Sequence, residues 1–357
     1  MADLVQSPFL HVAPDRIHNP LTDLTLLPGE SGFDLLAGVA NGALDPAAVA
    51  EGALRRLEEQ GWLIPSDGAA RWSQGFHLKY VGLEAHTLCN QGCYFCPVSV
   101  SPREPFFMPM EQYRDIVEQL AEYRATIETV FMINYNEPTA DKRFIEQVRT
   151  LKEAGLPPST LTNGTGLTPA RVDEIVEMGG LRYLSINLST LDQERYRSER
   201  LGDHLSLVLR NLDYAKDRRV ADEMDVIVLG RGDDTHQHDF EEIRARFEGS
   251  LFNVRKFEVM DRAGYLQIGL SARNKTLCGC DNLGSRPFQH VHITPHGKCL
   301  LCCEDYDENY VVGDLNEESL SEVLTGPKLA LLRRWVYGVE EAPEDFICRN
   351  CVFARTR

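Results

Sequence analysis

Apolar residues in the central part of the chain follow two alternating periods. Short runs rich in β-branched and aromatic residues predict strands. They occur at residues 78–85, 129–133, 159–162, 181–187, 223–229 and 251–259. Between them, apolar positions recur at the three- or four-residue spacing of a helix, as in residues 111–123. Repeated strand–helix units predict an α/β fold with a parallel sheet and helices outside it.

Six strands are too few for a closed eight-stranded barrel. We therefore expect a partial (β/α)6 barrel of the TIM type, or a doubly wound sheet, over residues 76–270. A helix at 168–180 shows the local signals: Thr168 suits the N-cap, Pro169 the first helical position, and Gly179 the end. In either architecture, functional groups are expected at the carboxyl ends of the strands.

Residues 1–75 predict a small separate unit. Residues 18–27 suggest paired short strands, and residues 45–64 predict a helix that Asp45 caps and Gly61 ends before a closing hairpin. This succession resembles the winged-helix domain that recognises peptides in, or beside, enzymes that mature ribosomally made peptides. A generic winged-helix module for packing or dimerisation fits the pattern equally well.

Residues 271–357 break the strand–helix rhythm. They are rich in turns and cysteines, with a single helix expected around residues 319–336. This composition predicts a third unit that binds metal.

Composition and charge exclude several classes of protein. No run of 18 apolar residues occurs, and residues 1–10 lack the basic and apolar regions of a signal peptide, so no membrane partner and a cytoplasmic location are expected. The net charge of −17 opposes contact with nucleic-acid phosphates, so no nucleic-acid partner is expected either.

The ten cysteines form two groups, at residues 89–96 and 278–351. In a reducing compartment this clustering favours metal over disulfides. The first group has the spacing Cys89-x₃-Cys93-x₂-Cys96 directly after the first barrel strand. Three thiolates on a tight loop can hold three irons of a 4Fe–4S cluster and leave the fourth iron open to a small molecule. Structural zinc is the alternative, with His86 as the nearest fourth ligand.

This spacing, with Phe95 before the third cysteine and a β/α array behind it, resembles the signature of the radical S-adenosylmethionine superfamily. The resemblance implies reductive cleavage of S-adenosylmethionine (SAM) to a 5′-deoxyadenosyl radical, which abstracts hydrogen from a substrate. It also implies a flavodoxin- or ferredoxin-type electron donor.

Segments after successive strands resemble the cofactor-binding elements of that family. Residues 134–139 resemble its Gly-Gly-Glu-Pro element, in which Glu137 binds the methionyl amino group, although Tyr135 and Asn136 replace the glycines. Ser185 and Asn187 resemble its ribose-binding residues. The complete set of implied cofactor contacts is Phe95, Asn136, Glu137, Asn163, Ser185, Asn187 and Arg262.

The second cysteine group resembles the SPASM extension, which carries auxiliary iron–sulfur clusters. Gly297-x₄-Cys302 matches the first half of its pattern, but the cysteines end at Cys351, which favours the abbreviated one-cluster twitch form. The resemblance implies one auxiliary 4Fe–4S cluster, with zinc as the alternative. Its implied ligands are Cys280, Cys302, Cys348 and Cys351, with Cys278, Cys299 and Cys303 spare, although Cys278 or Cys303 could replace a neighbour.

Asp305 lies just beyond these cysteines and is the candidate catalytic base for the proton that an oxidised substrate radical loses; a solvent-facing turn residue is the alternative. His290 and His292 alternate on one strand face and are candidates for substrate contact.

Two functions remain open. One is oxidative modification of a ribosomally made peptide that residues 1–75 hold. The other is dehydrogenation, epimerisation or rearrangement of a sugar or amino-acid derivative. A non-catalytic regulator that binds DNA is disfavoured by the acidic charge and the ordered cofactor segments.

Overall fold

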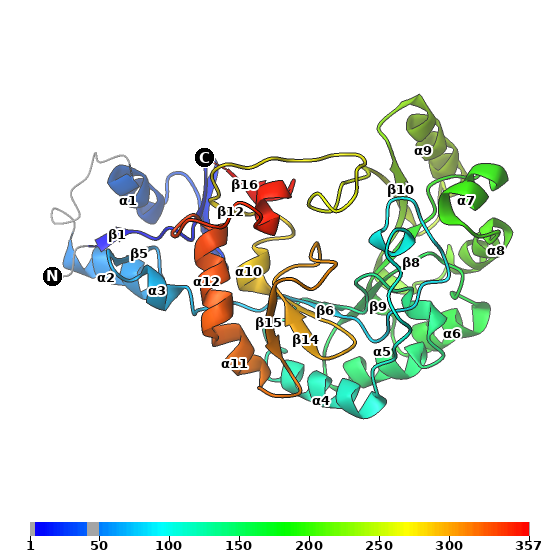
Figure 1. The fold of residues 1–357 in the computed structure, drawn as a ribbon, viewed down its shortest axis with the longest axis horizontal. Coiled ribbons are helices and arrows are strands. Elements are labelled where there is room, and N and C mark those ends of the chain that lie inside the picture. Colours follow the sequence, from blue (N-terminus) through cyan, green and yellow to red (C-terminus); the bar gives the residue numbers. More distant parts are fainter. Residues whose placement is uncertain (1–3, 41–49, 357) are drawn as a thin grey trace.

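The computed structural model describes residues 4–40 and 50–356. Its centre is a nine-stranded sheet with the order β11-β10-β9-β8-β7-β6-β13-β14-β15 (Figure 1). All six expected barrel strands are present, and each pairs in parallel with the next. They are β6 (Tyr80–Leu83), β7 (Thr129–Phe131), β8 (Pro158–Thr162), β9 (Leu181–Asn187), β10 (Ala221–Gly230) and β11 (Asn253–Glu258). Since β11 and β15 do not pair in the described residues, the barrel is partial, as expected.

Helices cover the outer face of this sheet (Figure 1). The predicted apolar stripe of α4 is buried at Tyr113, Ile116, Val117 and Leu120. Thr168 caps α6 as predicted, because its side chain accepts a hydrogen bond from the Arg171 N–H. The helices are α4 (Met110–Ala121), α5 (Phe144–Glu153), α6 (Pro169–Glu177), α7 (Gln193–Arg200), α8 (Leu205–Ala215) and α9 (Asp234–Arg246).

The C-terminal segment continues the sheet. Strand β13 (His290–Ile293) pairs in parallel with β6, and β14 (Lys298–Leu300) and β15 (Val311–Asp314) follow antiparallel. A separate two-stranded sheet joins β12 (Gly279–Cys280) to β16 (Ala354–Arg355). The short helix α10 (Arg286–Gln289) leads into β13.

The single helix expected around residues 319–336 is wrong. The structure has two helices, α11 (Leu320–Thr325) and α12 (Pro327–Val336). Gly326 between them is extended, with φ −64° and ψ 153°. Pro327 has no N–H to continue the first helix, and it disfavours helical geometry in the residue before it, so a new helix starts there.

The N-terminal unit has its own small core, with Ile17, Leu36 and Trp62 at its centre. The paired strands predicted in residues 18–27 are present as β3 and β4. The proposed cap Asp45 lies outside the described residues. The elements are β1 (Leu4–Gln6), β2 (His11–Ala13), β3 (Arg16–Asn19), β4 (Leu24–Leu26), α1 (Ser31–Ala40), α2 (Glu51–Glu59), β5 (Leu63–Pro65) and α3 (Ala69–Trp72).

The hairpin expected after Gly61 is wrong. Strand β5 pairs antiparallel with β1, at the beginning of the described chain. Residues 69–72, which a hairpin would need for its second strand, form α3 instead. Pairing with β1 buries Leu63 and Ile64.

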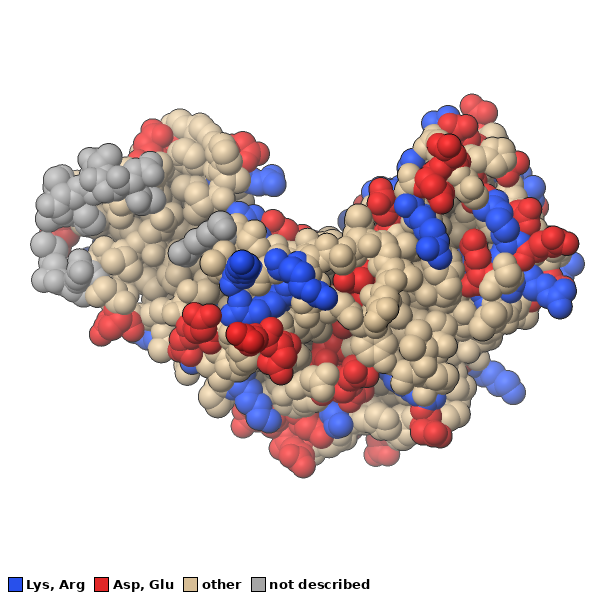
Figure 2. Space-filling model, turned by 45° about the horizontal axis from the view of Figure 1, so that its top comes forward, with Lys and Arg blue, Asp and Glu red and all other residues tan. Residues whose placement is uncertain are grey.

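The N-terminal unit docks on the C-terminal segment. The Phe9 ring packs edge-on against Phe288 and Tyr337, with centroids 5.2 and 5.5 Å away. His11 Nε2 lies 2.7 Å from the Tyr337 hydroxyl, and Arg355 donates to the Val12 carbonyl. Figure 2 shows a broad notch between this unit and the end of the barrel that carries α9. No helix in the described part of the chain is long and apolar enough to cross a bilayer.

A buried arginine joins three parts of the chain. Arg333, on α12, is 0% exposed and donates to the carbonyl oxygens of Ser73, Pro287 and Leu324 at 2.9, 2.7 and 2.9 Å. Burial lowers the pKa of its guanidinium to about 9. The side chain thus links the segment before β6 to the cysteine-rich segment.

We expect Arg333→Met to lower the free energy of unfolding by about 3 kcal/mol, because three buried carbonyls lose their donor. Urea-induced unfolding measures the loss. The matched control is Arg114→Met, which removes a half-exposed pair with Glu146 and should cost below about 0.5 kcal/mol. Equal losses in the two variants would contradict the role of Arg333.

Candidate iron–sulfur and cofactor site

The first cysteine group lies on the loop after β6, and the end of α7 holds this loop. The Gly92 N–H donates to the Arg200 carbonyl at 2.9 Å, and the Tyr94 N–H donates to the Glu199 carbonyl at 3.0 Å. Arg200 is the last residue of α7. The loop is therefore fixed by backbone hydrogen bonds at the carboxyl edge of the sheet, where function was expected.

A buried ion pair holds the far side of the same loop. Glu84 is 0% exposed and accepts two hydrogen bonds from Arg103, at 2.9 and 2.6 Å. Its Oε1 also accepts from the Tyr135 N–H at 2.9 Å. This bidentate pair has fixed geometry, so it ties the cysteine loop to the loop after β7.

The thiols of this group are partly or fully buried, and they receive N–H donors. Burial raises the pKa of Cys89 to about 12, and the Gln91 N–H opposes that shift. Burial also raises the pKa of Cys96, and the Val98 N–H opposes it. In both cases the N–H of the second residue after the cysteine donates to the sulfur, which stabilises the thiolate that binds iron. The loop therefore fits a cluster that supplies the positive charge these buried thiolates need.

The side chain of Arg200 contacts this loop and is 1% exposed. One terminal nitrogen donates to Cys93 Sγ at 3.7 Å, and the other donates to Asn187 Oδ1 at 2.6 Å and Ser189 Oγ at 2.8 Å. The guanidinium carbon lies 5.3 Å from the centre of the Phe95 ring. One cation therefore connects a candidate cluster ligand with a candidate ribose contact.

We expect Arg200→Met to weaken SAM binding at least about tenfold, because Asn187 loses a charge-assisted hydrogen bond worth about 1.5–3 kcal/mol. Equilibrium dialysis of the anaerobically reconstituted protein measures the Kd. Arg197→Met, at an exposed position of the same helix, is the control and should leave the Kd unchanged. A wild-type Kd in the Arg200 variant at full iron content would rule out this positioning role.

The carboxylate of Glu137 organises the loop after β8. It is 2% exposed; Oε1 accepts from Thr139 and Thr162, and Oε2 accepts from the Asn163 N–H at 2.7 Å. Burial raises the pKa of Glu137, and the hydrogen bonds from these donors partly oppose that rise. Oε2 keeps a free lone pair for a further donor such as a methionyl ammonium. Asn163 Nδ2 in turn donates to Asn90 on the cysteine loop.

The other implied cofactor contacts lie around this edge. Ser185 and Asn187 are at the end of β9, and Asn136 contacts His86 Nε2 at 3.4 Å. Arg262 has a left-handed backbone (φ +54°) and pairs with Glu304 at 3.4 Å. Arg262 thus reaches from the barrel toward the second cysteine group.

The fold brings three of the second-group cysteines together. Antiparallel pairing of β12 with β16 places Cys280 opposite Ala354, just beyond Cys351. Asn274 Nδ2 donates to the carbonyls of Cys348 and Cys351, at 3.0 and 2.8 Å. Burial raises the pKa of Cys348, and the thiolates of Cys280 and Cys351 raise it further.

Backbone N–H donors again mark the candidate ligands. The Asn282 N–H donates to Cys280 and opposes the rise in its pKa that burial causes. The Glu304 N–H donates to Cys302 Sγ at 3.5 Å. Cys351 receives the Phe353 N–H in the same way. Each donor lies two residues after its cysteine, as on the first loop.

The expected spare cysteines differ from one another. Cys299 is 0% exposed within the hydrophobic core, where it fills space. Cys303 lines a cavity of about 270 Å³ beside Arg262, Glu304 and Tyr135. Cys278 lies in the backbone pairing with Arg355.

Among residues 4–40 and 50–356, no three Cys, His, Asp or Glu side chains form a ready-made site for a single metal ion. A cubane cluster makes a different demand, since each of its thiolates binds a different iron. Partly or fully buried cysteines with N–H donors, on the loop after β6 and in the C-terminal segment, fit that demand.

The cavity of about 270 Å³ extends from Gly82 on β6 to Cys303 of the second cysteine group. Tyr135, which replaces a family glycine, donates its hydroxyl to the Cys303 carbonyl at 2.6 Å. His290 and His292, the candidates for substrate contact, line the same cavity. Burial, with a second contribution from Arg286, holds the pKa of both imidazoles well below the ordinary value, so they are neutral.

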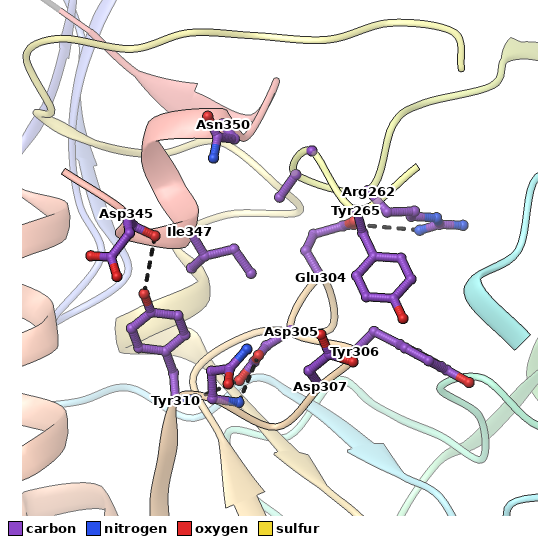
Figure 3. A pocket seen from close by; sticks show the side chains of 13 residues that line it. Arg262, Tyr265, Glu304, Asp305, Tyr306, Asp307, Tyr310, Asp345, Ile347 and Asn350 are labelled. Carbon is purple, nitrogen blue, oxygen red and sulfur yellow. Dashed lines mark hydrogen bonds and ion pairs between the residues drawn. The ribbon is translucent and has the colours of Figure 1, made fainter. Parts of the chain in front are cut away.

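Asp305 lines a different, larger cavity of about 520 Å³ (Figure 3). Its carboxylate accepts the N–H groups of Asn309 and Tyr310, at 2.9 and 2.7 Å. Burial raises its pKa. Asp305 therefore stabilises the turn of residues 305–310, and its side chain is held away from the cavity that Cys303 lines.

Two family models match this chain, and it is similar to proteins of known function. The Radical SAM superfamily model matches residues 84–246, and an iron–sulfur cluster-binding (SPASM) domain model matches residues 280–352. S-adenosyl-L-methionine-dependent 2-deoxy-scyllo-inosamine dehydrogenase of Niallia circulans is 24% identical over 76% of this chain and 91% of its own length.

Two solved structures share the fold. Streptococcus suis SuiB bound to precursor peptide SuiA is 12% identical, with a TM-score of 0.58 over 92% of this chain and 90% of its own. The structure of anSMEcpe with bound AdoMet is 13% identical, with a TM-score of 0.53 over 73% of this chain and 84% of its own.

The chain belongs to the radical SAM superfamily. It is a radical SAM enzyme with a C-terminal SPASM-type domain, and its cofactors are SAM, a SAM-binding 4Fe–4S cluster and an auxiliary iron–sulfur cluster. This membership removes the zinc alternatives and the non-catalytic regulator.

Sequence reasoning missed Arg200 and the Glu84–Arg103 pair. Arg200 ends a strongly charged helix, QERYRSER, and nothing in that pattern separates it from its exposed neighbours. A signal was available for Glu84, because a charged residue at the end of an apolar strand needs a partner.

Proposed function

We propose that this enzyme oxidises a ribosomally made peptide that its N-terminal unit holds. The observation that carries the proposal is strand β4, whose second edge pairs with no other strand in the described residues. Leu24 and Leu27 beside that edge are 42% and 51% exposed. A free edge with exposed apolar side chains suits an extended peptide added as a further strand.

The position of this unit supports the same proposal. Phe9 and His11 attach it to the C-terminal segment, and Figure 2 shows the notch through which a peptide could reach the barrel. The structure of SuiB holds a precursor peptide. Its similarity to this chain covers 92% of this chain, so the matched region includes part of the N-terminal unit.

The proposal assigns the chain to three domains: residues 1–75 for peptide recognition, 76–270 for the radical SAM barrel and 271–357 for the auxiliary cluster. Bound SAM and its cluster supply the 5′-deoxyadenosyl radical that removes hydrogen from the substrate. Cys89, Cys93 and Cys96 hold that cluster. Cys280, Cys302, Cys348 and Cys351 hold the auxiliary cluster, and Phe95, Asn136, Glu137, Asn163, Ser185, Asn187 and Arg262 orient SAM.

The remaining parts of the proposal concern protons, electrons and location. Asp305 serves as the catalytic base, although it needs to leave its turn hydrogen bonds to act. A flavodoxin- or ferredoxin-type protein donates electrons, and neither nucleic acid nor membrane is a partner. Ten free thiols suit a reducing compartment, the cytoplasm.

The second candidate is dehydrogenation of an aminocyclitol or another sugar derivative. It is favoured by the similarity to the inosamine dehydrogenase, which extends over 76% of this chain. In that case the N-terminal unit serves packing or dimerisation.

Anaerobic turnover of the full chain with SAM and a reductant separates the two. We expect the reaction to release 5′-deoxyadenosine and to remove two hydrogens from a peptide encoded beside the gene. Mass spectrometry of the peptide measures this loss. Leu24→Glu with Leu27→Glu should weaken peptide binding, whereas Leu251→Glu, at an exposed barrel position, should not. Turnover of an aminocyclitol without any peptide binding would decide for the second candidate.

A further inference from the structure

Arg286 lies at the boundary between the cavity of about 270 Å³ and the second cysteine group. It lines the cavity, yet it takes part in no ion pair among the described residues. One terminal nitrogen contacts His290 Nδ1 and His292 Nε2, at 3.1 and 3.0 Å. The other donates to Asn282 Oδ1 at 3.0 Å.

These partners leave the guanidinium incompletely satisfied. Its Nε is buried without a hydrogen-bond partner in the described part of the chain. All its side-chain partners are neutral, since both imidazoles have lowered pKa values. Burying a cation without a counter-charge costs free energy. We therefore expect a negative charge close to this guanidinium.

The negative groups around Arg286 are the thiolates of the second cysteine group and the carboxylate of Glu304, which lines the same cavity. Burial lowers the pKa of Arg286, but Cys303, Cys302 and Cys280 raise it, and the net shift is upward. The backbone N–H of Arg286 also donates to Cys280. Arg286 therefore contacts the candidate cluster ligands through its main chain and acts on them through its side chain.

A 4Fe–4S cluster on four thiolates carries net negative charge, and each added electron makes it more negative. A fixed cation in a low-dielectric environment stabilises the reduced state more than the oxidised state. Charge and hydrogen bonds around the sulfurs are known determinants of cluster potential.

We propose that Arg286 raises the reduction potential of the auxiliary cluster and so makes that cluster a better acceptor for an electron from the substrate side. Arg286 is a positioning residue that acts through the cluster. The proposal rests on the iron–sulfur domain and on Cys280 and Cys302 as ligands. It does not depend on whether the substrate is a peptide or a sugar derivative.

The test is a redox titration, followed by electron paramagnetic resonance, of the full chain without substrate. Replacing Cys89, Cys93 and Cys96 by alanine removes the first cluster, so the remaining signal belongs to the auxiliary cluster. In this background, Arg286→Gln should shift the one-electron equilibrium at least tenfold toward the oxidised state, about 59 mV. Arg286→Lys, which keeps the charge, should recover part of that shift.

Asn282→Asp gives a second route that leaves Arg286 in place. A carboxylate on the terminal nitrogen neutralises the cation, so the one-electron equilibrium should shift at least threefold toward the oxidised state. The matched control, Asn282→Leu, removes the hydrogen bond without adding charge and should change the equilibrium less than twofold.

Wild-type potentials in Arg286→Gln at full iron content would overturn the proposal. So would an unchanged potential combined with a raised KM for the substrate, because Arg286 would then be a substrate contact. If Arg286→Gln does not hold iron, Asn282→Asp decides: an unchanged potential in that variant overturns the proposal.

Discussion

Replacing Cys93 by alanine is expected to abolish SAM cleavage, with 5′-deoxyadenosine below detection, while the chain still folds. Cys93 is one of three thiols on the loop after β6, and two remaining thiolates cannot hold a cluster that leaves one iron free for SAM. Iron should fall from about eight to about four per chain, because the auxiliary cluster remains. Iron analysis and chromatography of the reaction products measure both effects.

Cys299→Ala is the matched control for this prediction. Cys299 is fully buried in β14, and its loss leaves a small cavity that should cost about 1 kcal/mol of stability. Iron content and SAM cleavage should stay at wild-type values. If Cys299→Ala lost four irons and Cys93→Ala none, the assignment of the first cluster would be wrong.

The second large effect concerns the auxiliary cluster. Cys348→Ala combined with Cys351→Ala should remove this cluster and reduce oxidised product at least about 100-fold, whereas SAM cleavage persists within severalfold. The first cluster and its SAM contacts lie on other loops, so cleavage does not need these two thiols. The measurement is the ratio of 5′-deoxyadenosine to oxidised substrate, together with iron content.

Cys302 and Cys303 provide the comparison that fixes the ligand set. Cys302 receives the Glu304 N–H, whereas Cys303 lines the cavity. We therefore expect Cys302→Ala to lose the auxiliary cluster and Cys303→Ala to keep it. The reverse result would move the fourth ligand to Cys303.

The sequence predicted what depends on short-range pattern. Runs of β-branched and aromatic residues located all six barrel strands, and the helical period located the buried face of α4. The Thr168 cap was also correct, because all these signals come from neighbouring residues. The cysteine spacing and the polar residues at strand ends led to the radical SAM superfamily, since one edge of a parallel sheet collects them.

Long-range contacts were not predictable in the same way. Tyr135 stands where the family has a glycine. Its hydroxyl donates to the Cys303 carbonyl, which is 168 positions away in sequence, so no local pattern reveals this contact. Arg286 precedes a proline in a turn-rich segment and resembles any surface arginine until its two histidine partners are placed. The break at Gly326-Pro327 was different, because local rules forbid a continuous helix there.

Strand β13 has a consequence for how the molecule can be divided. It lies between β6 and β14 in one continuous sheet, so a chain cut before residue 290 leaves β6, with Val81 and Leu83 fully buried in the native state, as a raw sheet edge prone to aggregation. The N-terminal unit has its own core but is packed against the C-terminal segment through Phe9 and His11, so its removal would likewise expose Phe288 and Tyr337. The two cysteine groups therefore lie on one folded body, and a truncation at either end would leave it with exposed apolar surface.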